Sequence, residues 1–163
     1  MSGTGVDALR EELLAACAVP SWADRVLARG PFGSREELRD VADAELAVAS
    51  EAEVDEALAG HPRIGERHEG AGGATSRREQ SAALDARDDV RAAIAEGNVA
   101  YEERFGHVYL VRAAGRSAQE MLDLLLERLR HEPADERRVV REQLREITAL
   151  RLGAPAPDAK EAS

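Results

Sequence analysis

The chain has 163 residues, of which 33% are charged and only 3% aromatic, and this length suits one domain of ordinary size rather than a two-domain enzyme. Its 22 basic residues against 32 acidic ones leave a net charge of −10. Such a charge repels a phosphate backbone and an anionic membrane, so it argues against nucleic-acid and membrane partners.

The cysteine content and the lack of long apolar runs indicate where in the cell the protein is located. Cys17 is the single cysteine, which excludes an intrachain disulfide or a cysteine-based zinc site and favours a buried, inert thiol in a reducing environment. The first 20 residues hold no apolar run of signal-peptide length, and the sequence has no stretch of about 18 uninterrupted apolar residues. We therefore expect a soluble, cytoplasmic protein.

Apolar residues at helical spacing predict four helices in the first 60 residues. Pro20 separates the first two, and Gly60 supplies the end of the fourth. Ser34 and Ser50 each precede a glutamate by three residues, which is the spacing of a capping box at the start of a helix. We expect two short helices that contain Leu9 to Leu14 and Trp22 to Leu27, followed by helices at residues 34–47 and 51–59.

Residues 60–75 change in character, because glycines and a proline interrupt regular structure there. We expect a loop of about fifteen residues, a length typical of functional or disordered connections. Ser76 has the capping-box spacing again and predicts a helix that continues, with a break near Asp88, to Phe105. Residues 107–112 indicate an extended segment, either a strand or a buried linker.

The last third of the chain contains the most apolar helix. Ser117 caps a leucine-rich segment that continues to Leu129, and we expect this helix to be central in the core. Pro133 begins a last helix with one apolar face and an arginine-rich face exposed to solvent. The predicted fold is all-α, a single-domain irregular bundle of about seven or eight helices over residues 1–153, with a flexible tail at 154–163.

His61 and Pro62 stand at the end of a predicted helix and at the mouth of the long loop. An imidazole there can give or take a proton near neutral pH, but spacing alone favours a simpler reading, a histidine that caps the helix carbonyls. A capping box with Ser76 is enough to explain Glu79, although Glu79, Gln80 and the N-terminal amides of this helix could also bind an amide-rich ligand. Arg151 either reaches solvent or binds an anionic substrate.

The motifs do not favour a metal or a nucleotide cofactor. His61, Glu66, His68 and Glu69 carry metal-binding groups, but the loop lacks the i, i+4 helical pair of a His-Glu-x-x-His site. The sequence contains no phosphate loop, dinucleotide fingerprint or serine nucleophile elbow. We expect no metal and no cofactor.

Four motifs follow one another along the chain. They are His61-Pro62-Arg63-Ile64-Gly65, Ser76-x-x-Glu79-Gln80, Asn98-x-x-Tyr101-x-x-x-Phe105-Gly106 and Ile147-x-x-x-Arg151-Leu152. In order and spacing they resemble the cofactor-independent decarboxylases of 2-oxo-4-hydroxy-4-carboxy-5-ureidoimidazoline (OHCU), which complete the route from urate to (S)-allantoin. The similarity extends from about Asp7 to Leu152. The family is all-α and commonly dimeric.

The resemblance implies a role for each matching residue. His61 is the implied central catalytic group, and Glu79 is its implied acidic partner. Gln80 and Arg151 are implied to bind the ureido, ring or carboxylate groups of the substrate, and Ser76 to contact ligand as well as to cap its helix. The remaining residues implied to bind substrate are Pro62, His107, Val108 and Tyr109.

The implied reaction is compatible with a site that lacks a cofactor. Loss of carbon dioxide from a carbon beside an amide carbonyl leaves negative charge that spreads as an enolate, and preorganised donors can stabilise this charge. Protonation on one face then gives a single enantiomer. The sequence does not identify the group that delivers the proton. No role is carried to Arg63, because many members have an acidic residue there.

Two alternatives stay open on the sequence. The first is a metal-assisted amidohydrolase that acts on a ureido compound through His61, Glu66 and His68. The second is a non-enzymatic helical interaction module. The resemblance itself implies a ureidoimidazoline as small-molecule substrate, a homodimer, and a functional link to urate oxidase and hydroxyisourate hydrolase.

Overall fold

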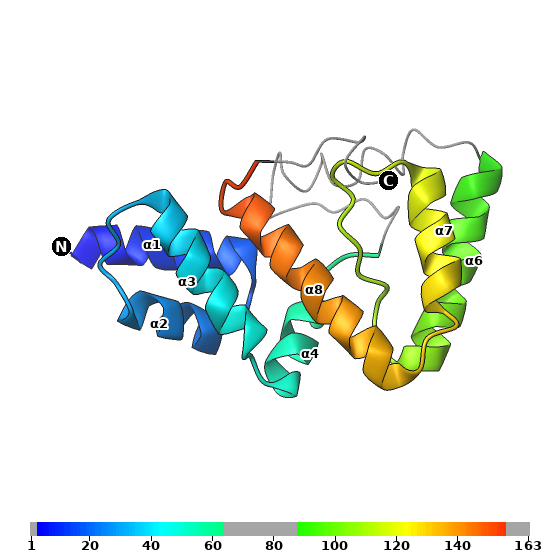
Figure 1. Ribbon diagram of the computed structural model, residues 1–163, viewed down its shortest axis with the longest axis horizontal. Helices are drawn as coiled ribbons and strands as arrows, with labels where there is room; N and C mark the ends of the chain where they lie inside the picture. Colours follow the sequence, from blue (N-terminus) through cyan, green and yellow to red (C-terminus); the bar gives the residue numbers. More distant parts are fainter. Residues whose placement is uncertain (1–2, 64–87, 156–163) are drawn as a thin grey trace. The chain divides into compact units, whose positions relative to one another are not determined.

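The computed structural model describes residues 3–63 and 88–155, which form seven α-helices and no β-strand (Figure 1). The helices are α1 (Gly3–Ala16), α2 (Pro20–Ala28), α3 (Arg35–Ala47), α4 (Glu51–Ala59), α6 (Asp88–Phe105), α7 (Ala118–Arg128) and α8 (Pro133–Arg151). The predicted all-α fold is confirmed. Within these residues no helix is both long and apolar enough to cross a membrane.

The described residues divide into two compact units. The first unit comprises residues 3–60 and 145–155, and the second unit comprises residues 61–63 and 88–144. Helix α8 contributes residues to both. The organisation expected from the sequence, one domain over residues 1–153 and a tail at 154–163, stays a prediction.

Serine caps start α3 and α4 of the first unit where the sequence places them. Ser34 caps α3 by accepting a hydrogen bond from the backbone N–H of Glu37 at 3.1 Å. Ser50 and Glu53 form a complete capping box at α4, in which each side chain accepts a hydrogen bond from the other residue's backbone N–H. At α3 the Glu37 carboxylate accepts instead from the N–H of Gly33, at 2.7 Å. Both arrangements satisfy amides that a helix start leaves without a partner.

Trp22 of α2 lies at the centre of the first unit. Its indole is fully buried and donates a hydrogen bond from Nε1 to the carbonyl oxygen of Ala42 in α3, at 3.1 Å. A buried indole N–H needs such a partner. Cys17 is a free, buried cysteine, as the sequence predicts. Other apolar side chains of this core are Leu13, Val26, Leu38, Leu46 and Val54.

Helices α6 and α7 pack closely against each other in the second unit. Gly97 makes this approach possible, because a Cβ atom at that position would come within 2.4 Å of Leu125 Cδ2. Gly106, with a φ of +80°, follows the end of α6, and Ser117 caps α7. The core of this unit contains Val90, Ile94, Tyr101, Tyr109, Val111, Ala113, Ala118, Met121, Leu122 and Leu125.

The segment that joins α6 to α7 is a buried linker rather than a strand. Side chains satisfy its backbone: Arg128 donates to the carbonyl oxygen of Leu110 at 2.7 Å, and the N–H of Arg112 donates to Gln143 Oε1 at 2.8 Å. Tyr109 and Val111 are buried beside these groups. Because side chains pair with these buried backbone groups, no partner strand is needed to satisfy them.

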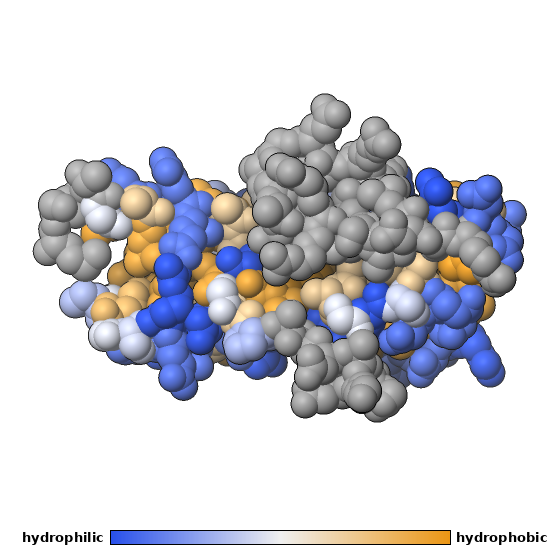
Figure 2. Space-filling view, turned by 90° about the horizontal axis from the view of Figure 1, so that it is seen from above, coloured by the Kyte–Doolittle hydropathy of each residue, from blue (hydrophilic) through white to orange (hydrophobic). Residues whose placement is uncertain are grey.

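The leucine-rich helix lies in the core as expected, with one difference in its register. Leu126 is 52% exposed, whereas Arg128 is buried at 3% exposure. Helix α8 buries the predicted apolar residues Val140, Leu144 and Ile147. On the face shown in Figure 2, apolar residues in orange alternate with hydrophilic ones in blue.

Candidate functional site

His61 and Pro62 directly follow the C-terminal end of α4, and both are half-buried. The next residue, Arg63, forms a bidentate ion pair with Glu102 of α6. Arg63 Nε donates to Glu102 Oε2 at 2.8 Å, and Nη2 donates to Oε1 at 2.9 Å. The structure therefore attaches the segment that carries the predicted catalytic histidine to α6, 39 residues further along the chain.

The turn of α6 that holds Glu102 also positions the predicted residues His107 and Tyr109. Tyr101 is fully buried, and its ring centroid lies 5.5 Å from that of His107 and 5.4 Å from that of Tyr109. His107 Nδ1 lies 3.0 Å from the carbonyl oxygen of Val108, which is half-buried. These contacts place one part of the predicted site against a single turn of helix.

Tyr109 is the most buried of the predicted substrate-binding residues that the structure describes. Its side chain is 2% exposed, and its hydroxyl donates to the carbonyl oxygen of Met121 at 2.9 Å. Burial raises the pKa of this phenol, so it stays protonated near neutral pH. Its hydroxyl therefore acts as a structural hydrogen-bond donor in this arrangement.

A buried charged cluster beneath these residues was not predicted from the sequence. Arg128 of α7 and Glu136 of α8 are 3% and 0% exposed, and Arg128 donates to Glu136 Oε2 from Nε at 2.9 Å and from Nη2 at 2.6 Å. The Tyr101 hydroxyl also donates to Glu136, and His131 Nδ1 lies 3.1 Å from Glu136 Oε1. The carboxylate is thus surrounded by donors.

The aromatic rings and the buried charges of this cluster affect one another. The guanidinium carbon of Arg128 lies 4.8 Å from the ring centroid of Tyr109 and 5.8 Å from that of Tyr101, within reach of a cation–π interaction. Burial opposes the charge of Arg128, but its bonds to Glu136 outweigh this and the pKa of the guanidinium is raised. Burial and the bond to Glu136 raise the pKa of Tyr101.

The helical spacing of apolar residues in the sequence could have predicted this buried cluster. Arg128 lies seven residues after Met121 and three after Leu125, so it falls on the apolar stripe of α7. Glu136 likewise falls four residues before Val140 on the stripe of α8. Two opposite charges, each at a position where its helix is otherwise apolar, indicate a buried ion pair.

The structure does not describe every predicted site residue. Ser76, Glu79 and Gln80 lie outside the described residues, and so do Glu66, His68 and Glu69 of the metal alternative. Arg151 is half-buried at the end of α8 in the first unit, where its Nη1 lies 3.4 Å from the carbonyl oxygen of Ala16. Among the residues that are described, no three His, Cys, Asp or Glu side chains are grouped to hold a metal ion.

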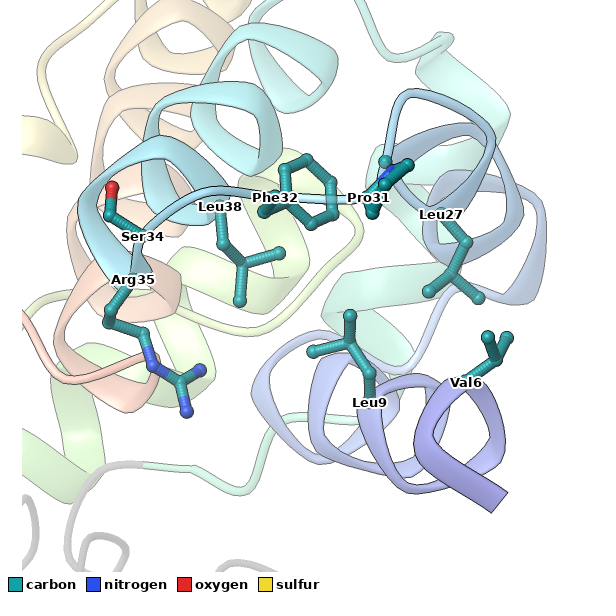
Figure 3. A pocket seen from close by; sticks show the side chains of 9 residues that line it. Val6, Leu9, Leu27, Pro31, Phe32, Ser34, Arg35 and Leu38 are labelled. Carbon is teal, nitrogen blue, oxygen red and sulfur yellow. The ribbon is translucent and has the colours of Figure 1, made fainter. Parts of the chain in front are cut away.

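A pocket in the first unit contains none of the predicted site residues. It has a volume of about 440 Å³ and lies between α1, the end of α2 and the start of α3 (Figure 3). Its walls are mainly apolar and include Leu9, Leu27, Phe32 and Leu38. The charged residue at its edge, Arg35, is paired with Glu12.

The described part of the site offers proton-transfer groups on a fixed backbone. Two imidazoles, those of His61 and His107, belong to segments held by one turn of α6, and the arginine of a carboxylate–guanidinium pair follows the first of them by two residues. Such an arrangement suits acid–base chemistry on a small polar substrate.

These features define an all-α protein in which one helix contacts the segments that carry the predicted site residues His61 and His107. Residues 4–153 match the sequence profile of the OHCU decarboxylase family. The chain belongs to this family.

Two characterised relatives are similar in sequence. The uric acid degradation bifunctional protein TTL of Arabidopsis thaliana is 28% identical over 147 residues, which cover 87% of this chain and 45% of that protein. The 2-oxo-4-hydroxy-4-carboxy-5-ureidoimidazoline decarboxylase of Amia calva is 40% identical over 98 residues, 56% of this chain and 55% of the relative. The chain thus spans about half the length of the curated relatives it matches.

Solved structures share the fold. The crystal structure of an OHCU decarboxylase in the presence of (S)-allantoin matches with a TM-score of 0.76 and 27% identity, and the match covers 87% of this chain and 94% of that one. An (S)-allantoin synthase matches with a TM-score of 0.67 at 18% identity, over 90% of this chain and 49% of the other. The second similarity concerns the fold alone.

Proposed function

We propose that this chain is a carboxy-lyase that converts 2-oxo-4-hydroxy-4-carboxy-5-ureidoimidazoline to (S)-allantoin in urate catabolism. The observation that carries the proposal is membership of the OHCU decarboxylase family over residues 4–153. The match to nearly the full length of an OHCU decarboxylase structure, 94% of that chain, supports it.

In this proposal His61 is the central catalytic group and Glu79 is its acidic partner. Gln80 and Arg151 bind the substrate's ureido, ring or carboxylate groups, and Ser76 contacts the ligand from the helix start. The attachment of residue 63 to α6 supports the role of His61, because it fixes the backbone two residues away. The further substrate-binding residues are Pro62 and the stretch His107, Val108 and Tyr109, whose backbone lines the pocket in this proposal.

The chemistry follows from how charge moves as the carbon–carbon bond breaks. Carbon dioxide leaves, and the bonding electron pair remains on the substrate carbon and spreads into the adjacent carbonyl as an enolate. Donors that are already in place stabilise this charge without a cofactor. His61 with Glu79 orients the carboxylate-bearing carbon and its hydroxyl. One of these two groups controls delivery of the proton to the carbon, and because the proton reaches a single face, the product has the (S) configuration.

The proposal extends to assembly and cellular context. The chain acts in the cytoplasm as a homodimer. Its activity is functionally linked to urate oxidase and hydroxyisourate hydrolase, the enzymes that precede it in urate breakdown. The net charge of −10 supports a small-molecule substrate rather than a nucleic acid.

The test generates the labile substrate from urate in situ and follows the optical activity of the allantoin formed. Wild-type protein should give rapid build-up of one enantiomer, observed by circular dichroism. His61→Ala should reduce the rate to the slow racemic background, with its helix content and unfolding midpoint unchanged as the control for folding. A wild-type rate equal to the background would overturn the proposal.

The same experiment separates the two alternatives. Consumption of the substrate without formation of allantoin, lost after exhaustive chelation and restored by a divalent metal, would support a metal-assisted amidohydrolase instead. Activity that is unchanged in both His61→Ala and Glu79→Gln, with both variants folded, would contradict the assigned roles. A wild-type protein without any activity would favour the non-enzymatic interaction module.

A further inference from the structure

The ion pair between Arg63 and Glu102 joins the segment of the predicted catalytic histidine to α6. It is bidentate, with Nε to Oε2 at 2.8 Å and Nη2 to Oε1 at 2.9 Å, so the two planar groups define an orientation as well as a distance. A monodentate contact would leave the guanidinium free to rotate about a single hydrogen bond. This pair therefore restricts how residue 63 lies against the helix.

The helix end of this ion pair is fixed by a fully buried neighbour. Tyr101 precedes Glu102, is 0% exposed, and donates its hydroxyl to the buried Glu136. Its ring also contacts the ring of Phe105, with centroids 4.7 Å apart. Glu102 thus projects from a turn of α6 that is held in the core, and its backbone has little freedom to follow a moving partner.

The other end of the ion pair lies close to the imidazole in sequence. One residue, Pro62, separates Arg63 from His61, and its ring fixes the backbone φ near −65°. Pro62 thus removes one of the backbone rotations between the two residues, and an orientation imposed at residue 63 restricts where residue 61 can lie. The geometry points to Glu102 as a positioning residue that acts through Arg63 to set the place of the His61 imidazole in the reaction.

This inference rests on the proposed function and assigns no substrate contact to Arg63 or Glu102. Their side chains are 50% and 25% exposed, and surface pairs of this kind contribute little to global stability. The expected consequence of breaking the pair is therefore local. Because small misplacements of a reacting group are costly in rate, we expect kcat to fall about tenfold or more while KM changes less than about twofold.

Three variants test the inference by activity. Glu102→Gln removes the charge and keeps the side-chain shape, and Arg63→Gln removes the opposite charge together with the guanidinium fork. Glu103→Gln is the matched control, because it removes the same charge from the next residue of the same helix at an exposed position. We expect kcat to fall in the first two variants, to stay at the wild-type value in the third, and the melting temperature to stay unchanged in all three.

The charge swap distinguishes the ion pair from other effects of the substitutions. The double variant Arg63→Glu with Glu102→Arg restores an oppositely charged pair and should recover most of the lost kcat. A kcat in Glu102→Gln equal to that of Glu103→Gln would overturn the inference. A double variant no better than the single ones would also overturn it, because the pairing itself would then not be what matters.

A spectroscopic measurement tests the positioning of His61 without measuring catalysis. The imidazole signals of His61 in a proton–carbon correlation spectrum, assigned with His61→Asn, should shift or broaden in Glu102→Gln and return in the charge swap, but not change in Glu103→Gln. If the wild type is inactive and these shifts occur, the proposed function fails and the positioning of His61 stands. If the wild type is active and the His61 signals are the same in all variants, the positioning inference fails alone.

Discussion

The carboxylate of Glu136 is fully buried, and its charge is held by Arg128, which is itself only 3% exposed. Glu136→Gln would leave the guanidinium buried without an opposite charge. Loss of one partner of a buried ion pair destabilises a protein strongly, because the remaining charge is buried without compensation. We therefore expect the free energy of unfolding to fall by about 3–5 kcal/mol. Urea denaturation monitored by circular dichroism measures this change.

The matched control for Glu136 is Glu132, an exposed residue in the turn before the same helix. Glu132→Gln should change the free energy of unfolding by less than about 0.5 kcal/mol, as surface substitutions usually do. Equal effects of the two substitutions would show that Arg128 finds another partner or reaches water when Glu136 is neutralised.

The thiol of Cys17 should be unreactive in the folded protein. It is 2% exposed, and burial raises its pKa to about 12, so both access and the thiolate needed for attack are lacking at pH 8. We expect no alkylation by iodoacetamide within an hour in buffer and complete alkylation in denaturing urea, observed by mass spectrometry. Stoichiometric labelling of the native protein would contradict the buried position.

Helix boundaries were largely predictable because they depend on local chemistry. Ser34, Ser50 and Ser117 cap helices at the positions indicated by their spacing to glutamate, and Pro133 begins α8. The partner of each capping group lies within three residues, so the sequence contains the whole interaction. Leu126 belongs to the leucine-rich helix but is exposed, because a helix with leucines on several sides packs only one of those sides into the core.

Pairings between distant residues were not predictable in the same way. Arg63 and Glu102 are 39 residues apart, and nothing local to either side chain specifies the other. The predicted site was therefore found only in part by residue chemistry, and its assignment depended on the resemblance to a family. The structure adds the helix turn at Tyr101 that holds the described pieces.

The packing of α6 on α7 depends on the absence of a side chain at Gly97. Alanine improves helix propensity by roughly 0.5–1 kcal/mol, but its Cβ would lie 2.4 Å from Leu125 Cδ2 and 3.1 Å from Cγ. Leu125 is fully buried and has no open side to move into. Overpacking of this kind costs about 1–3 kcal/mol, so Gly97→Ala should lower the free energy of unfolding in urea.

The exposed Ala92 on the same helix provides the propensity reference for this experiment. Ala92→Gly should cost roughly 0.5–1 kcal/mol with no packing change. If Gly97→Ala were to raise the urea midpoint, the helices would have room to separate and the close approach would not be required.

The junction of α2 and α4 should make stability depend on pH. Hydrogen bonds from Arg25 and Ser21, together with the backbone N–H of Ser50, lower the pKa of Glu53 to about 2, whereas an unfolded glutamate has a pKa of about 4.3. The folded state therefore binds this proton more weakly. The stabilisation is fully present above the unfolded pKa and is lost as pH falls from about 4.3 towards 2.

Glu53→Gln tests this dependence and retains a residue that can complete a capping box. The difference in free energy of unfolding between wild type and Glu53→Gln should be largest near pH 6 and should shrink steadily below pH 4. Glu56→Gln, at an exposed position of the same helix, should show a smaller and flatter difference. A wild-type advantage that is constant from pH 6 to pH 2 would contradict the shifted pKa.

At the scale of the whole molecule, charge opposes the compact state. The net charge of −10 gives a self-repulsion that acts over many ångströms and is screened beyond about 10 Å at 0.1 M salt. The buried pair of Arg128 and Glu136 is screened much less, because solvent ions do not reach it. Added salt thus weakens the repulsion more than it weakens this cluster.

We therefore expect the melting temperature to rise by a few degrees between 20 mM and 300 mM sodium chloride, measured by circular dichroism or calorimetry. Replacing the exposed Glu103 and Glu132 with lysine changes the net charge from −10 to −6 and should raise the low-salt melting temperature and flatten its salt dependence. Potassium chloride at equal ionic strength controls for ion-specific binding. A melting temperature that falls with salt would show that surface ion pairs such as Arg25 with Glu53 outweigh the net repulsion.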